Sequence, residues 1–523
     1  MVYLLPHSIQ NSASRFPDQE AFRCGTVAIR YAELNIQMCQ LAAVLKEQGV
    51  KRGDRIGIYM NRSLETAIAI YGILQAGAVY VPLDPLAPPA RLRFVINDCG
   101  IKHLVTNASQ RRNLPKLINE EIALESVIGT KAELPLRCIS WEEVRQMPDT
   151  TDRLTGLTEH DLAYILYTSG STGTPKGIMH THHSGLAYAR LTASTYGLNE
   201  KDKIGNHAPI HFDISTLGYL TAPLIGATTT IVPDAHTKMP ASLSQLIEKD
   251  KLTVWYSVPL ALIQLLQRGV LEERDLSSLR WVFYAGEAFP VKHLRALMQQ
   301  WPQARFSNIY GPTETNQCTN YDLPGPPQTD DPIPIGKVWE NTQMLILDED
   351  NQAVPRGEKG ELLIRSTTMM AGYWQQPERT RRSFYTHETV PGFKETYYRT
   401  GDLVAEDEQG LLHFYGRKDH QIKTRGYRVE LGEIETLLVS HPAVHEIAVF
   451  PHRNEEEEVA IIAAIILKTD QSATEQDFVD FLKNQLPWYA VPQQFILKTT
   501  FPRTSTGKVD RKALQKQMTE QTI

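Results

Sequence analysis

The stretch YTSGSTGTPKG, residues 167–177, combines the residue types that a phosphate-binding loop needs. Its three glycines let backbone N–H groups approach an anion closely, its serines and threonines add hydroxyl donors, and Lys176 adds positive charge. The strand-like LAYILYT, residues 162–168, leads directly into it. The spacing does not fit G-x-x-x-x-G-K-[ST], because the second glycine required after Gly170 falls on Pro175. We therefore interpret the stretch as a phosphate loop of another architecture, with a Gly/Ser-rich linker as the alternative.

Histidines and cysteines are the other residue types whose spacing could support chemistry. His180, His182 and His183 lie close together in IMHTHHS, which is one half of a metal-binding pattern. The second group of ligands at zinc spacing is missing, so we expect no metal site there. The five cysteines, at positions 24, 39, 99, 138 and 318, form no C-x-x-C pair. Their odd number and wide spacing favour a reducing cytoplasm, without a disulfide framework.

Composition and charge exclude several classes of protein. Hydrophobic residues make up 42% of the 523 residues and charged residues 22%, which is typical of globular domains. The formal net charge of −6 provides no basic field for nucleic acid. The N-terminus lacks the pattern of a secretory signal, and the most apolar run, AIIAAIIL at 460–467, is too short to cross a bilayer. We therefore expect no nucleic-acid partner and no membrane partner, and we interpret that run as a buried strand.

Apolar runs alternate with amphipathic segments up to about residue 300. A helical pattern, SLETAIAIYGILQAG at 63–77, is typical of the segments between them. This order predicts the α/β class, with layered subdomains around largely parallel sheets. A chain of this length exceeds one hydrophobic core, so we expect more than one domain. The strand-like runs are RIGIYM (55–60), AVYVPLD (78–84), LAYILYT (162–168), TTTIVPD (228–234), LTVWYSV (252–258) and LRWVFYAG (279–286).

The pattern changes after residue 320. A proline-rich loop at 322–336 is followed by short β-like runs, which predict a small β-rich subdomain over about 322–418. These runs are TQMLILD (342–348), GELLIRS (360–366) and LLHFYG (411–416). From residue 419 a separate segment begins that is long enough for a small α+β domain. Its expected elements are a helix at 432–441, a strand at 446–452 and a second helix near 474–486.

Nine motifs are spread along the chain in a characteristic order. They are IRYAELN (29–35), LQAGAVYVPLDP (74–85), YTSGSTGTPKG (167–177), HFDIS (211–215), YGPTE (310–314), GELLIRSTTMMAGYW (360–374), YRTGDL (398–403), GRKDHQIKTRGYRVELGEIE (416–435) and TSTGKVDRKAL (504–514). On these motifs the sequence resembles the adenylate-forming superfamily and, within it, the amino-acid adenylation domains of non-ribosomal peptide synthesis. The resemblance implies a large N-terminal domain, 1–418, and a small mobile C-terminal domain, 419–523.

The reaction implied by the resemblance has two halves. A substrate carboxylate attacks the α-phosphorus of ATP in the presence of Mg²⁺, giving an acyl-adenylate and pyrophosphate. The acyl group then passes to the phosphopantetheine thiol of a carrier protein. Two anions meet in the first half, so positioned cations and N–H donors are the main catalytic need. By resemblance, Lys508 reaches the carboxylate and α-phosphate, Glu314 is associated with Mg²⁺, and Thr313 lies near the α-phosphate.

Further residues are implied to bind the nucleotide. Tyr310 is expected to stack on adenine and Asn308 to bond its amino group. Asp402 is expected to accept from the ribose hydroxyls, although an aspartate there also fits a turn or cap. The resemblance implies that the phosphate loop, residues 167–177, acts as a lid over the β- and γ-phosphates of ATP. Lys176 is expected to assist the departure of pyrophosphate. The full set is Thr168, Ser169, Gly170, Ser171, Thr172, Gly173, Lys176, Asn308, Tyr310, Gly311, Asp402 and Arg417.

A hinge is also implied. Asp419 matches the position at which the small domain of the superfamily pivots. The rotation would withdraw Lys508 and present the region around Lys423–Gly426 to the incoming thiol.

The substrate residues point to an amino acid. Asp213 of HFDIS matches the aspartate that holds the substrate α-ammonium in amino-acid-activating members, which acyl-CoA ligases as a rule lack. A buried carboxylate needs such a cationic partner. His211, close by, is expected at the edge of the pocket. The set is Asp213, Ile214, Leu217, Tyr256, Phe283, Ala285, Gly286, Ile309, Gln317 and Cys318, closed by Lys508.

Apart from Asp213 and Lys508 this set carries no charge, which disfavours a charged substrate side chain. The pattern resembles that of free-standing L-proline adenylating enzymes, and Ile214, Phe283 and Gln317 are where the match is least close. We therefore expect L-proline, with alanine, valine or another small neutral amino acid as alternatives.

Three other functions remain open. A D-alanine–carrier protein ligase shares the chemistry, and an acyl- or aryl-CoA ligase would need no Asp213. A nucleotide-binding module without turnover is disfavoured by the joint presence of Lys508, Glu314, Asp402 and Asp213. Because no carrier-protein or condensation motif accompanies the adenylation motifs, we expect a stand-alone ligase of secondary metabolism whose carrier protein is a separate chain.

Overall fold

The computed structural model of the chain describes residues 1–119, 121–149, 154, 156–170, 174–419, 421–453, 459–503, 509–511, 513–515 and 517. These residues form two compact units. The larger unit comprises residues 1–85, 96–167 and 177–416. The smaller unit comprises the described residues from Arg417 onward, together with the short segments 86–95 and 168–176.

The first sheet of the larger unit, as far as the chain is described, has nine strands in the order β16-β15-β14-β13-β12-β10-β11-β1-β2. Its central strands run parallel, and β2, β15 and β16 are antiparallel to their neighbours. The strands are β1 (Glu20–Cys24), β2 (Val27–Arg30), β10 (Lys203–Asn206), β11 (Thr228–Ile231), β12 (Val254–Ser257), β13 (Trp281–Ala285), β14 (Arg305–Tyr310), β15 (Thr319–Asp322) and β16 (Lys337–Val338). The runs predicted at 228–234, 252–258 and 279–286 are confirmed as β11, β12 and β13.

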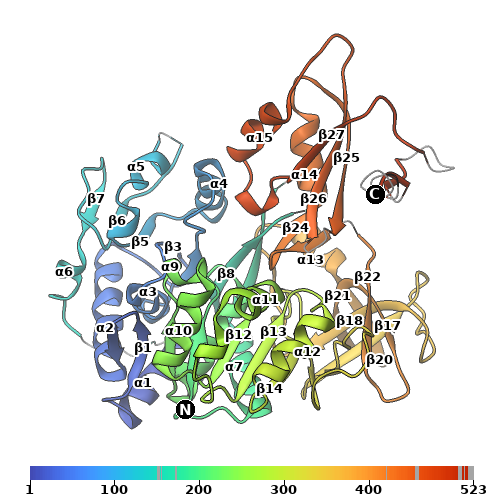
Figure 1. The fold of residues 1–523 in the computed structure, drawn as a ribbon. Helices are drawn as coiled ribbons and strands as arrows, with labels where there is room; N and C mark the ends of the chain where they lie inside the picture. The colour runs from blue at the N-terminus through green and yellow to red at the C-terminus, as the bar shows by residue number, and fades with distance from the viewer. Residues whose placement is uncertain are drawn as a thin grey trace. The chain divides into compact units, whose positions relative to one another are not determined.

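The two faces of this sheet pack against different helices because side chains alternate along a strand. One face carries Trp255, Val282, Tyr284 and Phe306 and packs against α10 (Pro240–Asp250), α11 (Pro259–Arg268) and α12 (Val291–Gln300). These helices lie in the green part of Figure 1, beside β12, β13 and β14. The opposite face packs against α7 (His182–Tyr196) and the π-helical turn η3 (Leu217–Thr221). Both faces are therefore buried, as expected of a parallel sheet.

The second sheet of the larger unit has the order β19-β9-β8-β4-β3-β5-β6-β7 among the described strands. They are β3 (Arg55–Tyr59), β4 (Val79–Pro82), β5 (His103–Thr106), β6 (Ser126–Ile128), β7 (Arg137–Ile139), β8 (Leu162–Thr168), β9 (Lys176–Thr181) and β19 (Gly372–Tyr373). The runs predicted at 55–60, 78–84 and 162–168 are confirmed as β3, β4 and β8. Strands β8 and β9 flank the glycine-rich stretch.

Helix α3 (Leu64–Gln75) lies between the two sheets. It contacts β1 of the first sheet and β3 and β4 of the second, and every residue from Thr66 to Gln75 is buried. A helix buried on all sides needs apolar residues all round, which is why AIAIYGIL shows no polar face. The helical pattern predicted at 63–77 is thus confirmed.

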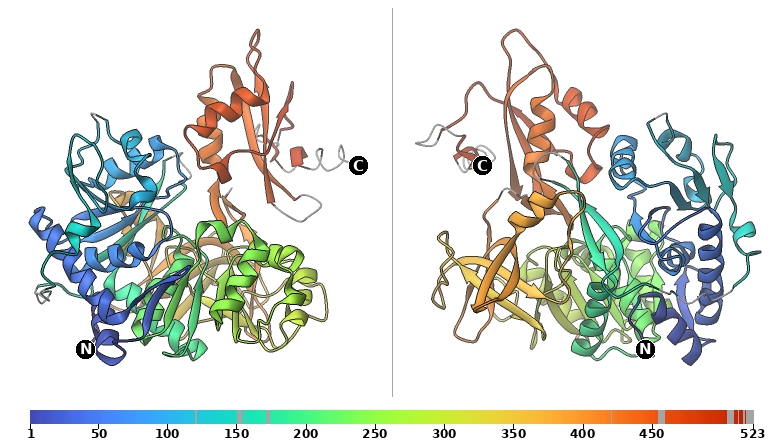
Figure 2. Two further views of the ribbon diagram at one scale, coloured as in Figure 1. Left: turned by 60° about the vertical axis from the view of Figure 1, so that its left-hand side comes forward. Right: turned by 180° about the vertical axis from the view of Figure 1, so that it is seen from behind.

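A smaller antiparallel sheet follows in the chain, as the view from behind in Figure 2 shows in yellow and orange. Its described strands are β17 (Thr342–Leu347), β18 (Gly360–Ser366), β20 (Phe384–Val390), β21 (Phe393–Glu406) and β22 (Leu412–Arg417). The predicted β-rich character of this region is confirmed. The long β20–β21 hairpin was not predicted, because FYTHETV and the polar residues after it lack an apolar run.

The smaller unit has a core of its own. Strands β25 (Val444–Arg453), β26 (Val459–Leu467) and β27 (Gln494–Leu497) form one sheet, and β23 (Gln421–Thr424) and β24 (Tyr427–Glu430) form a hairpin. Helices α14 (Leu431–Val439) and α15 (Glu475–Lys483) pack on the sheet through Ile434, Leu438, Phe478 and Leu482. The helices and strands predicted for this part of the chain are confirmed.

Further helices in the described part of the chain are α1 (Pro6–Arg15), α2 (Tyr31–Glu47), α4 (Pro89–Cys99), α5 (Leu114–Leu117), α6 (Trp141–Val144), α8 (Ala222–Ile225), α9 (Asp234–Thr237) and α13 (Pro377–Ser383), with the short turns η1 (Ala108–Gln110), η2 (Asp213–Ser215), η4 (Leu271–Glu273) and η5 (Trp488–Ala490). No helix in the part of the chain that the structure describes has both the length and the apolar character needed to span a membrane.

Candidate functional site

The residues predicted to contact a substrate lie mainly on one face of the first sheet. Tyr256 on β12 pairs in register with Phe283 on β13, and Ala285 pairs with Ile309 on β14. Phe283 and Ala285 are two residues apart, so all four side chains point to the same face. With Leu217 they pack into one cluster, which we call the aromatic cluster, together with Trp281, Tyr188, Tyr196 and Trp339. The structure therefore brings together five predicted residues from four separate segments of the chain.

Asp213 begins the short helical turn η2, which leads into the π-helical turn η3. The Thr216 hydroxyl donates to the Asp213 carbonyl oxygen and also contacts the Asn316 side chain. Ile214 is half-buried against the aromatic cluster. Burial raises the pKa of Tyr256 well above its ordinary value, and Tyr188 and the Asp213 carboxylate add to this effect. The carboxylate thus lies within electrostatic range of the aromatic cluster.

The turn after β14 carries Gln317 and Cys318. It folds tightly, because a Cβ atom on Gly311 would lie 2.5 Å from the Asn316 carbonyl oxygen, so glycine is required there. The Gln317 side-chain amide donates to the Tyr256 hydroxyl at 2.9 Å, which joins this turn to the aromatic cluster. Cys318 instead packs in a different cluster, with Ile335, Leu362, Ile364, Val404 and Leu412.

The β13 strand ends at Gly286, whose φ of +100° lies in the region that favours glycine. An added Cβ would meet only Val258, at 3.7 Å, so the backbone conformation rather than space requires glycine. Gly286 therefore permits the backbone to change direction sharply directly after Ala285.

Glu314 is completely buried in the same turn. The Tyr373 hydroxyl donates to its carboxylate oxygen Oε1 at 2.8 Å. Tyr373 reaches it because β19 pairs with β9, with Tyr373 opposite Ile178. The sequence motifs predicted a role for Glu314 but none for Tyr373. Tyr373 is the second-last residue of the motif GELLIRSTTMMAGYW (360–374).

His180 on β9 supports the neighbouring Thr313. Its Nε2 atom lies 2.9 Å from the Thr313 carbonyl oxygen, its Nδ1 atom lies 3.2 Å from the Ser184 hydroxyl, and its ring stacks on Tyr164. Burial lowers the pKa of His180 to about 4, so the ring is neutral at pH 7 and carries one proton. A carbonyl oxygen can only accept, so that proton lies on Nε2. The role of His180 was missed in the sequence, where it stood only as a metal-ligand candidate.

Among the described residues, no group of three or more histidine, cysteine, aspartate or glutamate side chains is placed to hold a metal ion. His182 accepts a hydrogen bond from the Leu5 backbone N–H, and His183 contacts Glu159. His211 lies 3.8 Å from Asp84 and is mostly buried. The three histidines of IMHTHHS thus have different partners.

Two of the predicted nucleotide residues of the larger unit, Tyr310 and Asp402, contact each other. The Tyr310 phenol donates to the Asp402 carboxylate, and the Asn308 side-chain amide donates to the Pro334 carbonyl oxygen at 2.8 Å. Asp402 is 4% exposed. Burial, with the Asp402 charge beside it, raises the pKa of Tyr310 well above its ordinary value, so the phenol keeps its proton and donates.

Other predicted nucleotide residues belong to the smaller unit. Ser169, Gly170 and Lys176 are buried, and Thr168 is half-buried. Arg417 forms a two-point ion pair with Asp419, the predicted hinge residue, at 2.6 and 2.9 Å. Ser171, Thr172, Gly173 and the predicted catalytic Lys508 lie outside the described residues.

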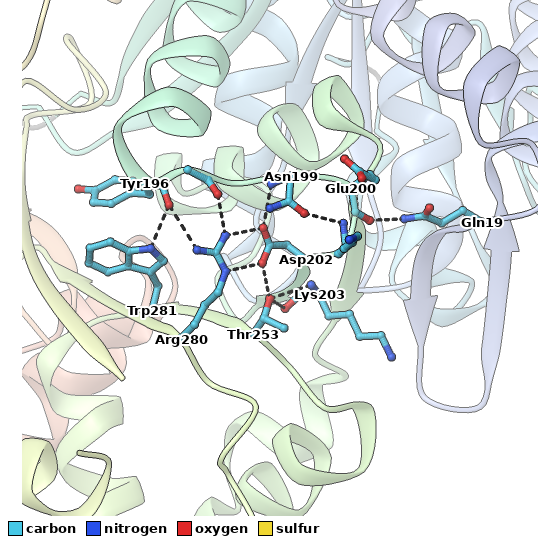
Figure 3. A network of polar contacts seen from close by, with 11 residues as sticks. Gln19, Tyr196, Asn199, Glu200, Asp202, Lys203, Thr253, Arg280 and Trp281 are labelled. Carbon is cyan, nitrogen blue, oxygen red and sulfur yellow. Dashed lines mark hydrogen bonds and ion pairs between the residues drawn. The ribbon is translucent and has the colours of Figure 1, made fainter. Parts of the chain in front are cut away.

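A polar network supports the aromatic cluster at the start of β13 (Figure 3). Arg280 forms two hydrogen bonds to the Asp202 carboxylate, at 2.7 and 2.6 Å, and Trp281 donates to the Tyr196 carbonyl oxygen at 3.0 Å. Burial alone would raise the pKa of Asp202, but the hydrogen bonds from Arg280 and its neighbours hold it below its ordinary value. The Tyr196 ring lies 4.3 Å from that of Phe283, centroid to centroid. The network therefore fixes the end of α7 and the first residues of β13 beside the predicted substrate residues.

Comparison with known proteins covers nearly the whole chain. The AMP-binding enzyme family matches residues 9–374, and the AMP-binding enzyme C-terminal domain matches residues 433–508. The chain is 32% identical, over 98% of its length, to an L-proline--[L-prolyl-carrier protein] ligase of Pseudomonas fluorescens, of which it covers 99%. It is 34% identical, over 94% of its length, to a protein of the same name from Streptomyces coelicolor, of which it covers 92%.

A solved structure shows the same fold. It is that of the Vibrio cholerae adenylation domain AlmE in complex with glycyl-adenosine-5'-phosphate, with a TM-score of 0.85 and 27% identity, covering 99% of this chain and 98% of that one. The predicted fold class is thus confirmed. The family match spans most of the residues in which the motifs were found. The chain therefore belongs to the AMP-binding enzyme family of ligases.

Proposed function

We propose that the protein activates an amino acid with ATP, forming an aminoacyl-AMP and releasing pyrophosphate, and then transfers the aminoacyl group to the phosphopantetheine thiol of a separate carrier protein. The single observation that carries this proposal is the place of Asp213. Asp213 is the first residue of the turn η2, and the next residue, Ile214, packs against the aromatic cluster, whose side chains are all neutral. A carboxylate beside apolar side chains favours a cationic ligand group, such as an α-ammonium.

The predicted residues have distinct roles in the proposed first half-reaction. Asp213 binds the α-ammonium and so aims the substrate carboxylate. Tyr310 and Asn308 hold adenine, and Asp402 accepts from the ribose hydroxyls while Tyr310 fixes its orientation. Lys508, on the segment beyond Arg503, carries the positive charge to the carboxylate and α-phosphate, where negative charge accumulates in the transition state.

Glu314 is the residue that would hold Mg²⁺. A buried carboxylate offers the hard oxygen ligands that Mg²⁺ prefers, and the hydrogen bond from Tyr373 fixes its orientation. Bound there, Mg²⁺ would neutralise charge between the phosphates of ATP. The Thr168–Lys176 loop would cover the β- and γ-phosphates, and Lys176 would stabilise the departing pyrophosphate.

The amino acid that we propose is L-proline. The predicted substrate residues are neutral apart from Asp213 and Lys508, and Phe283 and Tyr256 limit the available volume. Two relatives named as L-proline--[L-prolyl-carrier protein] ligases align with 92% or more of their own length. Their names also support a carrier protein as the acceptor. The free thiols of all five cysteines are consistent with a cytoplasmic reaction.

Pyrophosphate exchange into ATP tests this function, measured in turn with each of the twenty amino acids, with D-alanine and with carboxylic acids that lack an amino group. We expect L-proline to give the strongest signal, and Asp213→Asn to remove most of it because the ammonium loses its counter-ion. Exchange with glycine or D-alanine but not with proline would replace proline by a smaller substrate. Exchange only with acids that lack an amino group would show a CoA ligase instead, and no exchange with any acid would refute adenylation.

A second measurement addresses the acceptor. Holo carrier protein and free coenzyme A are each offered to the enzyme in the presence of ATP and the preferred amino acid. We expect thioester formation on the carrier protein only. A product formed with coenzyme A at a comparable rate would contradict the proposed second half-reaction.

A further inference from the structure

Gln317 places a polar amide beside side chains that are otherwise apolar or aromatic. It is 3% exposed and follows the tight turn at Gly311. Its Nε2 atom donates to the Tyr256 hydroxyl at 2.9 Å, and Tyr256 belongs to the aromatic cluster. The amide is therefore held in place next to the residues proposed to contact the substrate.

The other end of this amide is buried. No donor among the described residues reaches the Gln317 Oε1 atom, which is inaccessible to solvent. If the amide were turned by 180°, the oxygen would face Tyr256 and two N–H donors would be left in the same position. In either orientation a buried polar group has no hydrogen-bond partner among the described residues, which is costly in a folded protein.

A ligand that brings a hydrogen-bonding group would remove this cost. The ring of unsubstituted proline is made of methylene groups and cannot hydrogen-bond to an amide. A hydroxyl group on the ring can either donate to Oε1 or accept from the amide N–H groups, so it satisfies Gln317 in both orientations. Gln317 is also one of the positions at which the sequence matches the proline-activating pattern least closely.

We propose that Gln317 determines specificity by hydrogen-bonding a hydroxyl group on the substrate, so that the enzyme selects a hydroxylated proline over proline itself. This inference rests on the proposed adenylation of a proline-like amino acid, and within that class it replaces L-proline by a hydroxylated derivative as the preferred substrate. The same hydrogen bond penalises proline, because its binding leaves the amide unsatisfied in a dry environment.

The test compares kcat/KM for L-proline with kcat/KM for the cis and trans isomers of 3- and 4-hydroxy-L-proline, by pyrophosphate exchange. We expect at least one hydroxyproline to exceed proline by about 10-fold or more. In Gln317→Leu, which keeps the volume but removes the amide, we expect this preference to fall by about 10-fold, through both a loss for the hydroxyproline and a gain for proline. Because each preference is a ratio within one protein, it does not depend on how much of a variant is correctly folded.

Gln300→Leu is the matched control, since Gln300 is an exposed residue at the end of α12, which covers the opposite face of the sheet. It should keep the wild-type ratio. The inference is overturned if the wild-type enzyme prefers proline to all four hydroxyprolines, or if Gln317→Leu keeps the wild-type ratio. These outcomes leave the proposed adenylation intact. If neither proline nor any hydroxyproline supports exchange, the proposed substrate class fails and the inference fails with it.

Discussion

The hydroxyl group of Tyr373 donates a hydrogen bond to the carboxylate of Glu314 at 2.8 Å, and both side chains are buried. Substitution Tyr373→Phe removes only this donor. A carboxylate that loses its orienting partner is expected to bind a metal ion about 10-fold more weakly. Pyrophosphate exchange measured against Mg²⁺ concentration should therefore need more Mg²⁺ for half-maximal rate. Tyr415→Phe, on an exposed residue of β22, is the control. An unchanged Mg²⁺ dependence in Tyr373→Phe would count against Glu314 as the ligand.

His180 is predicted to be a positioning residue that acts through Thr313. In His180→Phe the Thr313 carbonyl oxygen loses its buried donor. We expect kcat to fall by about 10-fold, while the KM for the amino acid stays close to the wild-type value, because Asp213 and the aromatic cluster are untouched. His180→Gln retains an N–H donor and should recover part of the loss. If the two variants behave alike, the hydrogen bond is not what His180 contributes.

Lys508 is predicted to be the decisive cation of the first half-reaction. Lys508→Ala should lower the rate of adenylate formation by about 100-fold or more, because a charge aimed at the transition state is lost. Binding of ATP, measured by calorimetry, should remain detectable. Lys483→Ala, on an exposed residue of α15, provides the comparison. Exchange at the wild-type rate in Lys508→Ala would exclude the assignment.

Stability should depend on pH through the buried histidines. Burial lowers the pKa of His182 to about 4, whereas the unfolded chain has the ordinary value near 6.5. The folded state therefore binds fewer protons than the unfolded state in this range. The contribution of neutral His182 to the free energy of unfolding is fully present above pH 6.5 and is lost as the pH falls toward 4.

Urea unfolding at pH 7.5 and pH 5 measures this effect. Between these two values we expect His182 to cost about 2 kcal/mol of the free energy of unfolding. His182→Gln should reduce the difference between the two conditions by this amount. His183→Gln, on the half-exposed neighbouring residue, should leave it unchanged. An identical pH dependence in wild type and His182→Gln would contradict the prediction.

Strands and helices were predictable where hydrophobic pattern alone decides structure. LTVWYSV and LRWVFYAG are apolar on both faces, as strands between two helical layers must be, and both became central strands. Helix α3 was also predictable from its hydrophobic pattern, because apolar residues surround the whole helix and a helix buried on all sides requires this. The β20–β21 hairpin was not, because its exposed strands carry polar residues that resemble a loop.

The site was predictable only as far as motifs identify residues. Glu314, Asp402 and Asp213 stand in motifs, but their partners depend on contacts between distant segments. Tyr373 reaches Glu314 through the pairing of β19 with β9, and no local pattern specifies that pairing. The Gln317 oxygen, which has no partner within the described part of the chain, could not be foreseen, because hydrogen bonding depends on which side chains surround the amide.

The register of β12, β13 and β14 has a consequence for how substrate preference can evolve. Tyr256, Phe283, Ala285 and Ile309 occupy adjacent positions of a ladder whose hydrogen bonds involve only backbone atoms. Replacing one of these side chains by a smaller or larger one changes the shape of the surface while the ladder keeps its register. Substrate preference can thus change during evolution through single substitutions at these four positions, without any change in the fold of the enzyme.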